Sequence, residues 1–145
     1  MFSQNNPIIL YLNMAKSWEE KFFSKKNYEI KTIQKNFCGH VSGSKMLIPT
    51  PLMIQEYINH IELDNISDVE TMRKNLAIKY GADFTCPLST GIFLRIVAEF
   101  NYENKKLKDF QICPFWRIIN PNSKLSNNLT FDKKFLIRRR FNETR

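Results

Sequence analysis

Apolar residues in the middle of the chain recur at helical spacing. After Pro51 they fall at i, i+3, i+4 and i+7, a stripe that predicts a helix opened by Pro51 or Leu52: Ile54, Tyr57, Ile58 and Ile61. A second stripe follows the capping box Ser67-Asp68-Val69-Glu70 and ends at Gly81, which suits a helix C-terminus. A third, Ile92, Phe93, Ile96, Val97 and Phe100, predicts a helix capped by Ser89 or Thr90. These patterns predict a helix–turn–helix core preceded by one longer helix.

The flanking segments are less regular. A short helix is expected from Ser17 to Phe23, and extended chain is expected over residues 27–37 and 46–51. Residues 115–119 read as a strand, the turn signal 120–123 follows, and Lys124-Leu125 would begin a return strand. A hairpin after a helix–turn–helix predicts a winged-helix layout.

Two terminal segments and one internal loop complete the predicted architecture. Residues 1–15 read as a loosely held arm, Lys105 to Asp109 as a basic loop, and Phe131 to Arg140 as a basic C-terminal helix. We therefore expect an α+β protein with a winged helix–turn–helix core. We expect it to divide into a partly ordered N-terminal extension, residues 1–45, and a winged-helix domain, residues 46–145.

Charge is concentrated near the C-terminus. The chain of 145 residues has a formal net charge of +8, and residues 105–145 hold 11 basic and 3 acidic groups. Residues 61–104, which include the predicted helix–turn–helix, hold 4 basic and 7 acidic groups. A basic balance favours anionic partners, above all nucleic acid. The acidic middle instead favours a protein-interaction or structural module docked on a larger assembly, such as a ribonucleoprotein.

The cysteine count and the hydropathy of the chain bear on where the protein is located in the cell. Three cysteines form no disulfide framework, and no apolar run is long enough to span a membrane, so we expect a cytoplasmic protein. Cys38 and His40 with Cys86 and Cys113 offer four metal ligands, but not at the paired spacing of structural zinc sites. We therefore expect no metal and no cofactor. Cys86 and Cys113 read as core residues, with a displaced nucleophile as the alternative.

The stretch Pro114-Phe115-Trp116-Arg117-Ile118-Ile119 resembles the Pro-Cys-His-Arg-Val-Val signature of the O6-alkylguanine-DNA alkyltransferases. The chain also resembles a bacterial subgroup of that superfamily that lacks the active-site cysteine. It shares with this subgroup Cys86-Pro87-Leu88, Gly91-Ile92-Phe93, Met46-Leu47-Ile48-Pro49 and Trp18-x-x-Lys21. The resemblance implies a winged-helix DNA-binding body.

The departures from the family pattern concern its chemistry. Phe115 stands where the alkyl-accepting cysteine should be, and Trp116 where the histidine that activates it should be. Neither side chain is a nucleophile or a base. Asp68 replaces the tyrosine that presses on the target phosphate, and the position of the arginine finger falls near Gly91. We therefore expect no alkyl transfer.

The leading hypothesis is a non-catalytic nucleic-acid-binding protein, with DNA preferred over RNA, no membrane, and a protein partner left open. An aromatic pocket would sense a base, with Phe115 bordering it and Trp116 packed beneath against the helix of Ile92 and Ile96. The alternative for both residues is an ordinary packed strand. Arg117 is either a structural group that bonds carbonyls or a phosphate ligand, and Arg138 to Arg140 are either a phosphate clamp or a solvated helix end. The candidate binding residues are Thr90, Arg95, Phe115, Trp116, Arg117, Lys124, Asn128, Arg138, Arg139 and Arg140.

Overall fold

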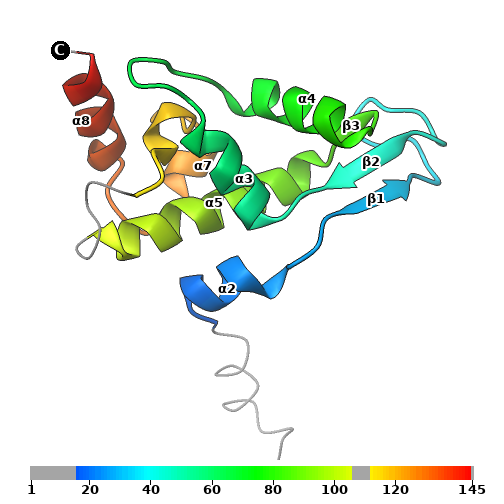
Figure 1. Ribbon diagram of the computed structural model, residues 1–145, viewed down its shortest axis with the longest axis horizontal. Helices are drawn as coiled ribbons and strands as arrows, with labels where there is room; N and C mark the ends of the chain where they lie inside the picture. The colour runs from blue at the N-terminus through cyan, green and yellow to red at the C-terminus, as the bar shows by residue number, and fades with distance from the viewer. Residues whose placement is uncertain (1–15, 106–111, 145) are drawn as a thin grey trace, which may run out of the picture.

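The computed structural model describes residues 16–105 and 112–144. These residues form six α-helices, one 3-10 helix and a small mixed sheet, which confirms the α+β class (Figure 1). The arm expected over residues 1–15 lies outside the described residues, as does most of the basic loop expected from Lys105 to Asp109.

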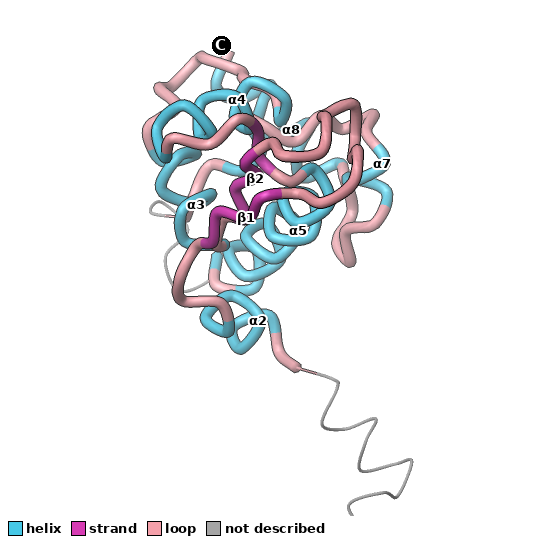
Figure 2. Tube along the Cα trace, turned by 90° about the vertical axis from the view of Figure 1, so that its right-hand side faces the viewer, coloured by secondary structure: helices cyan, strands magenta, loops and turns pink. Residues whose placement is uncertain are grey.

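The sheet has three strands in the order β1-β2-β3. β1 (Glu29–Thr32) pairs antiparallel with β2 (Lys45–Ile48), and β2 pairs parallel with the two-residue β3 (Phe84–Thr85). Figure 2, in which the strands are magenta, shows them side by side with α4 (Val69–Tyr80) above them, and α4 contacts both β2 and β3. The sequence pattern predicted no strand at the position of β3.

The helices expected in the first two thirds of the chain are confirmed, with shifted ends. α2 (Trp18–Ser24) is capped by Ser17 as expected, and α3 (Pro51–Asn59) begins at Pro51. α4 ends at Gly81, whose φ of 73° is the left-handed conformation that glycine adopts without strain. Its N-cap is Asp68 rather than Ser67, because the Ser67 amide donates to the carbonyl of Arg117.

α5 (Pro87–Glu103) begins before the predicted Ser89 or Thr90. The Cys86 sulfur accepts from the Ser89 amide as its N-cap, and Pro87 occupies the first turn, where a missing N–H costs nothing. α5 packs against α2 and α3, and their buried side chains form the core together with residues that follow α5. Phe22 from α2 stacks on Phe100 of α5 at 4.5 Å within this packing.

The hairpin expected after α5 is wrong. Residues Phe115–Arg117 form the 3-10 helix η2, and Lys124–Asn127 form the short helix α7. The Ser123 hydroxyl accepts from the Ser126 amide, so the polar turn at residues 120–123 caps a helix rather than joining two strands.

The basic C-terminal helix is confirmed as α8 (Lys134–Glu143). It begins three residues after Phe131, which stacks on Tyr102 of α5 at 3.9 Å. Its contacts with η2 hold the end of the chain against the core. Among the described residues, no helix combines the length and the apolar character that crossing a membrane requires.

Candidate functional site

Phe115 was expected to border an open aromatic pocket, with Trp116 packed beneath it in the core. Phe115 is completely buried and Trp116 is almost completely buried. Their rings meet edge to face at 5.5 Å, and both pack on Phe135 of α8. The placement of Phe115 beside a pocket is therefore wrong, while the core position of Trp116 is confirmed. Its aromatic contacts include Phe135 of α8, while Ile92, one of its two expected partners on α5, is largely exposed.

Arg117 is the centre of a largely buried hydrogen-bond network. Its Nε and Nη2 donate to both carboxylate oxygens of Glu143, at 2.8 to 3.2 Å, and its Nη1 donates to the carbonyl of Ile61 at 2.6 Å. The indole Nε1 of Trp116 donates to the same carboxylate at 2.8 Å. Burial alone would raise the pKa of Glu143, but the hydrogen bonds from Arg117 and Trp116 outweigh it and hold that pKa low. These contacts match the structural alternative for Arg117.

The three consecutive arginines of α8 do not form one clamp. Arg140 points inward and donates to the carbonyls of Trp116 and Ile119. The guanidinium of Arg139 lies over the rings of Trp116 and Phe135, at 4.9 and 5.1 Å from their centroids. Arg138 alone of the three is exposed. Successive residues of a helix are about 100° apart, so a run of three cations cannot share one face.

α5 offers few polar contacts where a recognition helix would meet DNA. Thr90 is completely buried, and its hydroxyl donates to the carbonyl of Cys86. Arg95 lies over the Trp18 ring at 5.3 Å, with its Nε 4.0 Å from the buried carboxylate of Glu99. The exposed positions include Leu88 and Ile92, 64% and 60% exposed.

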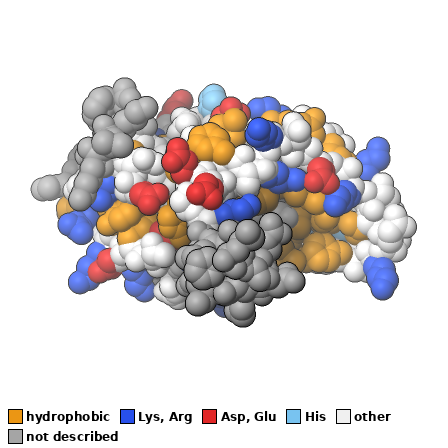
Figure 3. All heavy atoms as spheres, turned by 90° about the horizontal axis from the view of Figure 1, so that it is seen from below, with side chains coloured by type: hydrophobic (Ala, Val, Ile, Leu, Met, Phe, Trp, Pro, Cys, Tyr) orange, Lys and Arg blue, Asp and Glu red, His pale blue; other side chains and the backbone are white. Residues whose placement is uncertain are grey.

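Lys124 and Asn128 are exposed at the two ends of α7. Asn128 is the C-cap of that helix, and neither side chain has a hydrogen bond or ion pair in the part of the chain that the structure describes. They and Arg138 are the predicted binding residues whose side chains reach solvent freely. Figure 3, which views the molecule from another side, shows cationic and acidic side chains interspersed rather than gathered into one patch.

The cysteines near the motif are buried. Burial raises the pKa of the Cys113 thiol far above its ordinary value, and the charge of Arg117 offsets only part of that effect. Cys86 caps α5 from a buried position. Both therefore occupy the core positions expected for them, whereas Cys38 is exposed. Among residues 16–105 and 112–144, no group of three or more His, Cys, Asp and Glu is placed to hold a metal ion.

The outward side of α8 collects exposed cations and apolar groups. We call Lys133, Lys134, Ile137, Arg138 and Phe141 the α8 outer face. Ile137 is 49% exposed and Phe141 is 59% exposed, one helical turn apart. In the described residues, the side chains of Lys133, Lys134 and Arg138 make no ion pair. The sequence indicated the cations of this face but not its exposed aliphatic and aromatic side chains.

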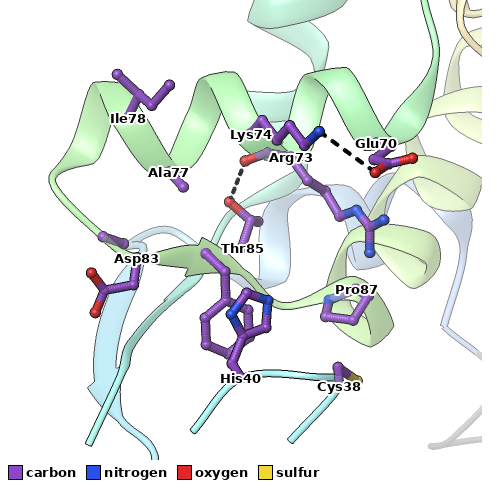
Figure 4. Close-up of a pocket in the computed structure, with 12 residues that line it drawn as sticks. Cys38, His40, Glu70, Arg73, Lys74, Ala77, Ile78, Asp83, Thr85 and Pro87 are labelled. Carbon is purple, nitrogen blue, oxygen red and sulfur yellow. Dashed lines mark hydrogen bonds and ion pairs between the residues drawn. The ribbon is translucent and has the colours of Figure 1, made fainter.

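A groove that the sequence did not indicate lies beside α4. It has a volume of about 520 Å³ and is bounded by α4, by β3 with the start of α5, and by the tight turn at Phe37–His40. Figure 4 shows the guanidinium of Arg73 directed into it from α4, across from Pro87 and Cys38. The His40 ring is stacked on the Phe84 ring at 3.7 Å on the opposite wall. No motif predicted it, because the turn that holds Cys38 and His40 lies about thirty residues before the rest of the lining.

Comparisons with known proteins leave the family open: no family model, no curated protein and no solved structure matches this chain.

Proposed function

We propose that this protein binds nucleic acid without catalysing a reaction, and that the α8 outer face supplies the contacts. The observation that carries the proposal is the pattern along α8. Cations and apolar side chains alternate on its solvent side, while its opposite side is locked onto η2 by Arg117 and Arg140. A rigid helix with free cations suits phosphate binding, and an exposed aromatic ring suits stacking on an unpaired base.

The inward-facing arginines reduce the number of cations that can contact phosphate. Arg117, Arg139 and Arg140 are engaged with protein groups, so they hold α8 in place rather than contacting phosphates. Three exposed cations remain on the α8 outer face: Lys133, Lys134 and Arg138. If each neutralises one phosphate, the slope of log affinity against log salt would be about −2.7. The expected binding is therefore weak and steeply salt-dependent.

An alkyltransferase-like origin remains part of the proposal. The succession of α3, α4 and α5 supports it, because three helices in this order precede the motif at Pro114 to Arg117. The absence of a hairpin after α5 removes the wing from the proposed interface. DNA is the first partner proposed on this basis, and RNA is the alternative within the same chemistry.

We propose that the protein does not catalyse alkyl transfer because neither Cys86 nor Cys113 offers an accessible thiolate. The buried Cys113 has a raised pKa, and Cys86 is held as a helix cap. A nucleophilic cysteine needs an accessible thiolate. Incubation with DNA containing O6-methylguanine, followed by intact mass measurement, should leave the mass unchanged. A gain of one methyl group on Cys86 or Cys113 would overturn this part of the proposal.

The location of the interface is tested by a matched pair of double variants. Lys134→Gln with Arg138→Gln removes two cations from the α8 outer face, and Lys26→Gln with Lys35→Gln removes two exposed cations elsewhere. Fluorescence anisotropy with labelled single-stranded and duplex DNA and RNA measures affinity. We expect the α8 variant to lose affinity on the order of tenfold to a hundredfold at low salt, and the control to lose far less. Equal losses in both variants would contradict the placement on α8.

A second candidate function rests on a different observation. Leu88 and Ile92 lie one turn apart on α5 and are largely exposed, where a DNA-reading helix would carry polar groups. Exposed aliphatic side chains at this spacing suit a protein partner. This alternative predicts that no nucleic acid binds at low salt, and that Leu88→Ser with Ile92→Ser raises solubility without loss of folding.

A further inference from the structure

The groove beside α4 has a wall that is already in place without a ligand. Phe37 and His40 exchange two backbone hydrogen bonds of 2.9 Å, and the residues between them, Cys38 and Gly39, both have positive φ. That is the geometry of a two-residue hairpin turn. The coplanar contact of His40 with Phe84, at an interplanar angle of 3°, ties this turn to β3. Because this wall is already ordered, little conformational entropy is lost when a ligand binds there.

Some charged side chains of the groove have partners in the part of the protein that the structure describes, and one does not. Glu70 forms an ion pair with Lys74 at 3.6 Å, and the Asp83 carboxylate accepts from the Lys45 amide at 2.7 Å. Figure 4 places Asp83 at the end of the groove away from the Arg73 guanidinium. Within the described residues, that guanidinium has no hydrogen bond or ion pair. A partly enclosed arginine with unused donors is suited to a carboxylate or phosphate.

The uncharged part of the lining is mostly apolar, with His40 and Thr85 as its polar members. Ala77, Ala82, Phe84 and Pro87 contribute side chains without charge, and the volume of about 520 Å³ lies within the range typical of small-molecule sites. The small side chain of Ala77 on α4 leaves room in front of the stacked rings of His40 and Phe84. An aromatic or heterocyclic ring would fit this part of the groove better than a flexible chain.

We propose that this groove binds a small organic anion, whose phosphate or carboxylate is held by Arg73 and whose flat ring lies against Pro87 and the stacked pair of His40 and Phe84. The site is independent of the proposed nucleic-acid interface. Figure 1 places α8 and the turn between β1 and β2 at opposite ends of the molecule.

The chain contains its own reporter for this site. Of its three cysteines, Cys38 lines the groove and is exposed, while Cys86 and Cys113 are buried. Iodoacetamide is neutral and does not compete for an anion site, so the rate at which it alkylates Cys38, followed by intact mass, measures whether the groove is occupied. Three probes separate the parts of the proposal: adenosine monophosphate has ring and anion, adenosine has the ring, and inorganic phosphate has the anion.

We expect adenosine monophosphate to slow alkylation of Cys38 and to shift the amide resonances of His40 and Arg73. Adenosine and phosphate should do so only at much higher concentrations. Arg73→Gln should weaken the effect of adenosine monophosphate about tenfold or more, and Glu70→Gln, which removes the nearest competing carboxylate, should strengthen it. Lys26→Gln and the α8 double variant should leave it unchanged.

Several results would overturn the inference. Unchanged alkylation together with unchanged amide resonances would show that the groove does not take this class of ligand. An undiminished effect in Arg73→Gln, or adenosine acting as strongly as its monophosphate, would refute the anion site. Phosphate acting as strongly as adenosine monophosphate would refute the ring site.

Discussion

Replacing Arg117 with methionine tests the network that fixes α8. The change removes the donors to Glu143 and to the carbonyl of Ile61, and it leaves a carboxylate whose side chain is only 15% exposed without its cation. Breaking a largely buried ion pair on one side costs about 3 to 5 kcal/mol. For a domain of this size, that loss corresponds to a fall in Tm on the order of 10 °C. Urea unfolding followed by circular dichroism measures the free energy of unfolding.

Two further variants make the test specific. Glu143→Gln keeps an acceptor for Trp116 and for one donor of Arg117, so it should cost about 1 to 2 kcal/mol. Arg138→Gln removes a cation from the exposed side of the same helix and should change stability by no more than about 0.5 kcal/mol. A loss below about 1 kcal/mol for Arg117→Met would refute the network as the element that holds α8.

Three further outcomes follow from single sites. Hydrogen bonds hold the pKa of Glu143 in the folded protein below its ordinary 4.5. The ionised carboxylate should therefore stabilise the fold fully above pH 4.5, and this stabilisation should be lost as the pH falls through the folded-state pKa. Urea unfolding midpoints measured across the acidic range would reveal this loss. Iodoacetamide should alkylate Cys38 in the native protein, while Cys86 and Cys113 should react only on unfolding; equal rates would contradict their burial. Gly81→Ala should cost about 1 kcal/mol through strain alone, since a Cβ there meets no atom within 4 Å, and a neutral result by thermal unfolding would refute the left-handed cap.

The helices were predictable because their signals are local. Ser17, Pro51 and Gly81 act on the backbone within a few residues, so their stripes and caps locate α2, α3 and α4. β3 was not predictable, because a strand of two residues carries no periodicity. Its pairing is set by β2, where Leu47 is the partner of Thr85, 38 residues later in the chain.

The stretch after Pro114 was misread for a related reason. Its β-branched residues Ile118 and Ile119 favour a strand, but Arg117 reaches Ile61 and Glu143, which are far away in the sequence. Those contacts favour the compact turn of η2. The same long-range packing buries Phe115 and Trp116, which removes them from any open site. The sequence locates the three arginines, but only the packing of α8 on the core shows that Arg138 faces solvent while Arg139 and Arg140 face inward.

The central claim is that the α8 outer face binds nucleic acid through a few phosphate contacts. The most direct test is the slope of log affinity against log salt for a labelled oligonucleotide, measured on the wild type and on Lys134→Gln with Arg138→Gln. The account predicts a slope of about −2.7 that falls to about −0.9 in the double variant. A slope that is the same in both proteins, or wild-type binding that salt does not weaken, would contradict it.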